Sequence, residues 1–146
     1  MSEPAPAAVV LTQVAVPESL AAACAVSKVP VDAVPTPIGA VAVCRSLEPG
    51  GPEQAAEVIS RLLRTTPVVL LTQRGGRMTA VRWSAGSPGE ELSPALMLDG
   101  APPEVEQLLL GQVGAGELPG MVSSVGMSRW RAVRLLGTAA RVGRRA

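Results

Sequence analysis

Residues 52–84 read PEQAAEVISRLLRTTPVVLLTQRGGRMTAVRWS, and the prediction of the fold starts from them because they hold a helix followed by a hairpin. In the first part of this stretch, apolar residues recur at helical spacing and charged residues face away from them, so an amphipathic helix is predicted over 52–65. Glu57 and Arg61 stand four residues apart in the favourable order, which supports the same helix.

The second part of the stretch predicts two antiparallel strands. Residues 67–73, PVVLLTQ, begin a strand, and 77–84 alternate between the two faces of the next strand. Gly75-Gly76 fits the tight turn between them, since both turn positions require positive φ. Trp83 lies on the second strand, where it is expected to be a core residue; on an exposed face it would instead be an interface anchor.

The remaining elements are predicted from apolar runs, prolines and glycines. Strands are expected over 8–16, 38–45 and 93–98, helices over 17–27, 103–111 and 128–142, an extended proline-rich connection over 28–37 and a polar loop over 85–92. The predicted fold class is therefore α/β (or α+β), a mixed sheet of about five strands covered by helices, with a basic amphipathic helix at the C-terminus. Two right-handed βαβ crossovers would make the first strands parallel, and the hairpin would add antiparallel ones.

The length of 146 residues fits one domain. We expect a disordered leader over 1–6, a single α/β domain over 7–111, a glycine-rich linker over 112–126 and the basic helix over 127–146. No signal-peptide pattern is visible, and no apolar run approaches the ~20 residues that span a bilayer, so a cytoplasmic location is expected.

The composition excludes much catalytic chemistry. The chain lacks Phe, Tyr, His and Asn, a bias typical of a GC-rich, bacterial genome. Without histidine there is no Ser-His-Asp triad and no histidine metal ligand. Cys24 and Cys44 do not form a CxxC pair and are expected to be small buried hydrophobes, a disulfide or a reactive thiol being the alternatives. No catalytic, cofactor-binding or metal-ligating residue is predicted, and an enzyme is the less favoured class.

Charge is distributed very unevenly along the chain. Residues 1–117 hold seven basic and twelve acidic residues, a net charge of −5, whereas 118–146 hold six arginines and no acid, a net charge of +6. On a helical wheel one face of the C-terminal helix carries the candidate partner-binding residues Trp130, Arg131, Arg134, Arg141 and Arg145. This pattern predicts docking on an acidic protein partner.

Other roles for the C-terminal helix stay open. Its apolar face would pack on the protein's own sheet if the arginines are only a solvated face. Contact with an anionic membrane surface is less favoured because the apolar face is alanine-rich and Trp130 lies on the opposite side. Nucleic-acid binding is disfavoured by the negative body and by the absence of stacking aromatics.

Three weaker patterns have ordinary structural explanations beside functional ones. Residues 114–120 match GxGxxxG, a spacing of some dinucleotide-binding turns, but are expected to be a flexible hinge. Residues 73–77 suit an anion-binding loop or, more simply, a hairpin turn. A run of carboxylates is expected to be solvated surface rather than an acid–base pair or cation site: Glu90, Glu91, Asp99, Glu104 and Glu106.

Taken together, these features predict a non-enzymatic interaction protein, an accessory, adaptor or assembly subunit that binds a protein partner through its C-terminal helix. A homo-oligomer formed through sheet edges or through the hairpin is a further possibility. The competing hypothesis is a small-molecule-binding domain or small enzyme, with a ligand site at the strand carboxyl ends near Gln13, Arg45 and Thr72.

Overall fold

The computed structural model describes the backbone of residues 5–145 and the side chains of residues 5–137. The strands are β1 (Ala7–Leu11), β2 (Val31–Val34), β3 (Val41–Cys44), β4 (Val68–Arg74), β5 (Arg77–Ser84), β6 (Ser87–Leu92) and β7 (Val122–Ser123). The helices are α1 (Pro17–Val26), α2 (Gly51–Leu63), α3 (Pro94–Asp99), α4 (Pro103–Leu109) and α5 (Arg129–Arg145), with a 3-10 turn, η1 (Ala115–Glu117).

The seven strands form one sheet in the order β6-β5-β4-β1-β3-β2-β7, and every neighbouring pair is antiparallel. The units β1-α1-β2 and β3-α2-β4 each join two strands that point the same way but are separated by a third strand. This interlocked pair of split βαβ units is the ferredoxin-like arrangement. The strands β5 and β6 extend it at one edge and β7 at the other. The protein is therefore an α+β protein.

The prediction that the first strands are parallel neighbours in the sheet is wrong, because the proline-rich segment contains a strand that was not predicted. Residues 31–34 form β2, which pairs with β3 through Val31↔Cys44 and Val34↔Val41. Because β3 lies between β1 and β2, the two parallel strands of the first crossover do not touch. The β2–β3 connection is a hairpin rather than an extended spacer.

Two other predicted elements change type. Residues 93–98 were predicted as a strand, but Pro94 occupies the first turn of α3 and Ser93 caps it, its Oγ accepting a hydrogen bond from Leu96 N–H at 3.4 Å. Residues 85–92 were predicted as a loop and contain β6, an exposed edge strand that pairs with β5. The hairpin itself is confirmed, with Arg74 opposite Arg77 across Gly75-Gly76.

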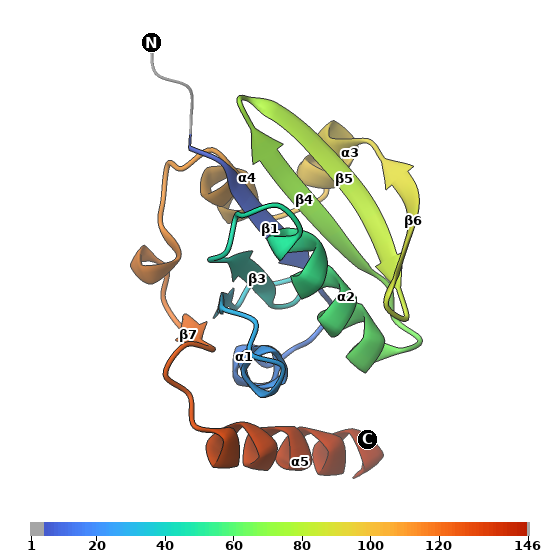
Figure 1. Ribbon diagram of the computed structural model, residues 1–146, viewed down its shortest axis with the longest axis vertical. Helices are drawn as coiled ribbons and strands as arrows, with labels where there is room; N and C mark the ends of the chain where they lie inside the picture. Colours follow the sequence, from blue (N-terminus) through green and yellow to red (C-terminus); the bar gives the residue numbers. More distant parts are fainter. Residues whose placement is uncertain (1–4, 146) are drawn as a thin grey trace.

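The helices form a layer on each face of the sheet (Figure 1). The helices α1 and α2 bury Cys24 and Ile59 against one face, which also holds Trp83, so the prediction that Trp83 is a core residue is confirmed. On the other face, α4 buries Val105 and Leu109. The last helix, α5, packs on α1. The alanine-rich α1 is buried over most of its surface because it lies between the sheet and α5.

Parts of the segment that leads to α5 are packed on the domain. Glycine content predicted a linker over 112–126, but Ala115 of η1 is buried and β7 pairs with β2. Ser124 is also buried, and its Oγ donates to Val29 O at 2.8 Å and accepts from Val31 N–H at 2.9 Å. These bonds fix the chain only a few residues before α5 begins.

Candidate functional site

The first turn of α5 is fixed by a cap and by packing. Ser128 precedes the helix, and its Oγ accepts a hydrogen bond from Arg131 N–H at 3.1 Å, the usual bond of a serine N-cap. Ala132 is fully buried in the described part of α5, which packs on α1. Small side chains on both helices allow this close approach.

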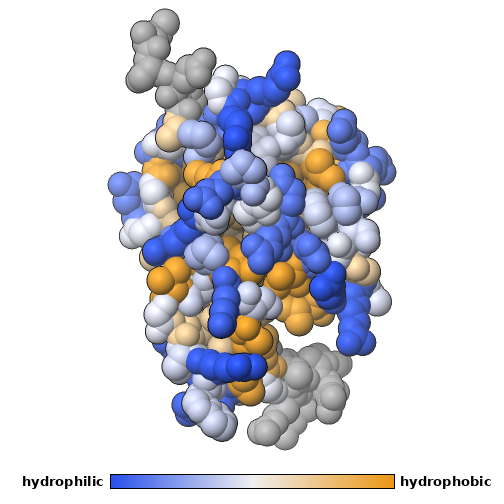
Figure 2. Space-filling model, viewed as in Figure 1, coloured by the Kyte–Doolittle hydropathy of each residue, from blue (hydrophilic) through white to orange (hydrophobic). Residues whose placement is uncertain are grey.

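The opposite face of α5 points into solvent. Trp130 is 81% exposed, the most exposed of the large apolar side chains that the structure describes. Arg131 and Arg134 are also exposed, and Arg134 stands one helical turn after Trp130. Figure 2 shows strongly hydrophilic side chains over the described part of α5, at the bottom of the view. Arg141 and Arg145 belong to the same predicted set, but their side chains lie outside the described residues.

The charged residues of α5 are all basic. No carboxylate described in the structure lies within ion-pair distance of Arg129 or Arg131. The chain beyond Leu118 contains no acidic residue at all. Trp130 is thus exposed beside Arg129 and Arg131, for which the described part of the chain offers no carboxylate partner. Trp and Arg are among the residue types enriched at the hot spots of protein–protein interfaces.

Comparison of the chain with protein-family models, with curated proteins and with solved structures finds no match.

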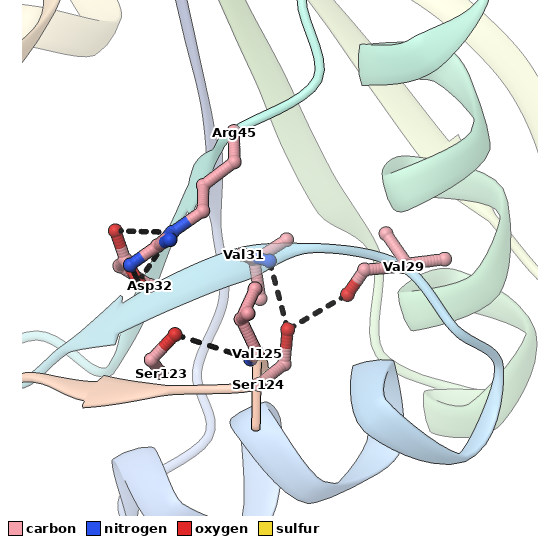
Figure 3. A network of polar contacts seen from close by, with 7 residues as sticks. All are labelled: Val29, Val31, Asp32, Arg45, Ser123, Ser124 and Val125. Atoms are coloured by element: carbon pink, nitrogen blue, oxygen red, sulfur yellow. Dashed lines mark hydrogen bonds and ion pairs between the residues drawn. The ribbon is translucent and has the colours of Figure 1, made fainter. Parts of the chain in front are cut away.

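Beside β7, a network of hydrogen bonds and one ion pair fixes the backbone of the segment that leads to α5 (Figure 3). Arg45 Nε donates to both carboxylate oxygens of Asp32, at 2.9 and 3.0 Å, and the carboxylate is largely buried while the guanidinium is half exposed. On the neighbouring strand, Ser123 Oγ accepts from Val125 N–H at 3.1 Å. With Ser124, these bonds join β3, β2 and β7 side by side, so this network positions α5 rather than forming a reactive site.

The residues of the predicted small-molecule site are not brought together. Because β1 and β3 are antiparallel, Gln13 after β1 and Arg45 after β3 lie at opposite ends of the sheet. Thr72 pairs with Ala8 near the start of β1, far from Gln13. Thr72 does line a small, solvent-open groove beside the first turn of α2, which Arg74 also lines. A small-molecule site stays a prediction.

The polar groups of Gln73 and Gly76 at the hairpin turn are engaged in hydrogen bonds within the protein. Gly75 and Gly76 have φ of 60° and 79°, as a two-residue turn requires, and Gly76 N–H donates to Gln73 Oε1 at 3.0 Å. Gln73 is buried, and its Nε2 donates to Ala5 O and to Leu109 O, both at 2.9 Å. The sequence pattern gave no sign of this role, because a glutamine next to a turn is normally exposed.

The predicted carboxylate run lies on β6, α3 and α4 and is mostly exposed. Within the described part of the chain, its one ion pair joins Glu90 to Arg82 at 4.0 Å. The described side chains include no group of three His, Cys, Asp or Glu residues placed to hold a metal ion. Nor does any helix in this part of the chain have the length and hydropathy needed to cross a membrane.

Cys24 and Cys44 are free, buried thiols, as predicted. Burial, with a smaller contribution from the neighbouring Cys44, raises the pKa of the Cys24 thiol from 9.0 to about 12. Burial likewise raises the pKa of the Cys44 thiol to about 12, with a smaller contribution from Glu53. The reactive thiolate is therefore scarce at neutral pH, so both residues are core hydrophobes rather than nucleophiles.

A pH titration of stability tests this assignment. A thiol whose pKa is raised in the folded state stabilises that state fully below its unfolded pKa and loses this contribution as pH rises towards its folded pKa. The melting temperature is therefore expected to fall from pH 9 to pH 12. The chain has no tyrosine and only one lysine, so few other side chains titrate there.

The double variant Cys24→Ala, Cys44→Ala should show a flatter decline, with Lys28→Arg as the control for the single lysine. A reducing agent should leave the wild-type melting temperature unchanged at neutral pH. An equally steep decline without the two thiols, or a shift on reduction, would contradict the assignment.

Proposed function

We propose that this protein is an interaction protein that binds an acidic surface of a protein partner through the outer face of α5. The observation that carries the proposal is Trp130, 81% exposed beside Arg131 on the face of α5 that points away from α1. An indole as exposed as that of Trp130 gains the free energy of apolar burial only when another surface covers it.

The geometry of α5 favours a protein over a membrane as the partner. An amphipathic helix binds a bilayer by inserting its apolar face, leaving its charged face in the headgroup region. Here α1 already covers the side of α5 that contains Ala132. The exposed side carries Arg131 and Arg134 with two apolar side chains, Trp130 and the half-exposed Val133, which match a carboxylate-rich surface with an apolar recess.

Surface substitutions provide a cleaner test than removing the helix. Deleting α5 would uncover α1, and any loss of binding would then be confounded with a change in the fold. Trp130 and Arg131 are exposed, so Trp130→Ala and Arg131→Glu should leave the melting temperature within about 1 °C of wild type. Both variants keep the Ser128 cap and the packing of Ala132.

The experiment is affinity capture from the native host at low salt, followed by purification of the recovered protein and measurement of its affinity. We expect each substitution to weaken binding by about thirtyfold, as at interface hot spots, and moderate salt to weaken it as well. The matched control is Arg77→Glu, an equal charge change at an exposed arginine of the hairpin. Equal affinity of Arg131→Glu and wild type would refute docking through this face.

A further inference from the structure

A second surface of the molecule is the chemical complement of α5. Between Arg82 and Arg129 the chain has six acidic residues and no basic one. They lie on β6, α3, α4 and η1: Glu90, Glu91, Asp99, Glu104, Glu106 and Glu117. We call the part formed by β6, α3 and α4 the acidic surface.

Most of these carboxylates lack a cation. Glu90 lies 4.0 Å from Arg82, at the limit of an ion pair. The others make no ion pair with any residue that the structure describes. Among the described residues, the acidic surface therefore has unbalanced negative charge, and Arg129 and Arg131 on α5 have unbalanced positive charge.

The acidic surface also contains an apolar residue that matches Trp130. Leu96 of α3 is 73% exposed, second only to Trp130 among the large apolar side chains that the structure describes. It stands three residues before Asp99, so the two share a face of the helix. On α5, Trp130 is likewise flanked by charge, but of the opposite sign.

The two surfaces cannot meet within one molecule. The helix α5 covers the outer side of α1, on the face of the sheet that also holds α2. Leu98 of α3 and Val105 of α4 pack on the opposite face. Figure 1 shows α5 at one end of the long axis and α3 and α4 towards the other. Contact between them requires two molecules.

We infer that the acidic partner surface is supplied by a second copy of this chain. The outer face of α5 docks on the acidic surface of the next molecule, with Trp130 against Leu96 and the arginines among the carboxylates. This inference rests on the proposed function, since it uses the same face of α5. The two contact patches differ, so the association is heterologous: each added copy leaves one free surface of each kind, and assembly continues unless it closes into a ring.

Sedimentation velocity of the purified full chain tests the inference directly. At low salt the mean mass should rise with protein concentration beyond that of a dimer, and moderate salt should reduce it because the charges are exposed. Trp130→Ala should raise the dissociation constant by about thirtyfold, and Leu96→Ser should weaken assembly in the same direction. Arg77→Glu should assemble like wild type.

A mixing experiment distinguishes head-to-tail assembly from a symmetric dimer. One variant carries Trp130→Ala with Arg131→Glu and keeps the acidic surface; the other carries Leu96→Ser with Asp99→Asn and keeps α5. Each alone should be a monomer, and the mixture should form a one-to-one dimer that does not grow, because it contains one intact interface. Circular dichroism of each variant checks that it is folded.

Other outcomes overturn the inference. A wild type that stays monomeric at every concentration refutes self-assembly, and so does a mixture of the two variants that fails to pair. The proposed function is judged separately, since a captured heterologous protein that depends on Trp130 would uphold docking through α5 even if the chain does not self-assemble. If neither self-assembly nor capture depends on Trp130, both proposals fail.

Discussion

Replacing Gly39 by alanine is expected to lower the free energy of unfolding by about 2–5 kcal/mol. Gly39 lies in the β2–β3 connection with φ of +130°, a conformation that L-residues with a side chain rarely adopt. An added Cβ would overlap the carbonyl oxygen of Thr12 and lie 2.9 Å from Gln13 Cα. Both contacts are with backbone, which has no flexible side chain to move aside.

The chain at Gly39 lies close to the residues after β1 because hydrogen bonds join these two segments. Next to it, Ala40 N–H donates to Val14 O at 2.7 Å, and Thr12 Oγ1 donates to Ala40 O at 2.7 Å. Relieving the overlap would stretch these bonds, so we expect the variant to melt about 10 °C lower than wild type. The loss should extend to the whole cooperative unit, since β1 and β3 are neighbours in the centre of the sheet.

Gly111→Ala is the matched control for this measurement. Gly111 also has positive φ, +72°, but an added Cβ there would meet nothing within 4 Å. It should cost only the conformational penalty of an alanine after a helix, about 1 kcal/mol. Denaturant unfolding curves of the two variants measure the difference, and equal losses would show that the overlap with Thr12 is not the cause.

Replacing Gln73 by methionine is expected to cost about 2–4 kcal/mol of stability, although the volume of the side chain hardly changes. The amide of Gln73 ties the hairpin turn to the C-terminus of α4, because it accepts from Gly76 N–H and donates to Leu109 O. Methionine can make neither bond. The buried carbonyl of Leu109 would lose its side-chain donor without access to water, which is the expensive part of the loss.

Gln107→Met on α4 is the control, since Gln107 is exposed and the chemical change is identical. It should alter stability by less than about 0.5 kcal/mol. Hydrogen exchange gives a second readout, because amides of α4 and of the hairpin should lose protection together in the Gln73 variant. Unchanged stability of Gln73→Met would show that the network contributes little to holding α4 on the sheet.

The sequence predicted well those elements that are defined by neighbouring residues. The helix expected over 52–65 is α2, Gly51–Leu63, and the strands expected on either side of Gly75-Gly76 are β4 and β5. The spacing of apolar residues in a helix and the residue types required by a turn depend on a few neighbouring residues. They can therefore be recognised without any tertiary information. The charge asymmetry and the amphipathic character of the C-terminal helix are legible for the same reason.

Other predictions failed where a local preference was outweighed by distant contacts. Val31–Val34 follow a proline and precede two more, yet they form a strand because β3 supplies their hydrogen bonds. Ser93 and Pro94 suit a strand edge as well as a helix start, and packing of the helix on the sheet selects the helix. The order of strands and helices led us to expect parallel strands that are neighbours in the sheet. The same order is compatible with split βαβ units, in which a third strand lies between the two parallel strands.

For the candidate site, the sequence determined which residues line up on α5, because helical periodicity places Trp130 and Arg134 on one face. Which face of the helix is covered was decided by the tertiary structure alone. The alanine-rich α1 lies where Ala132 can pack, and Ser124 fixes the segment that leads to the helix. Arg131 and Arg134 are thereby turned outwards. These contacts join residues about a hundred positions apart, and no pattern of neighbouring residues records them.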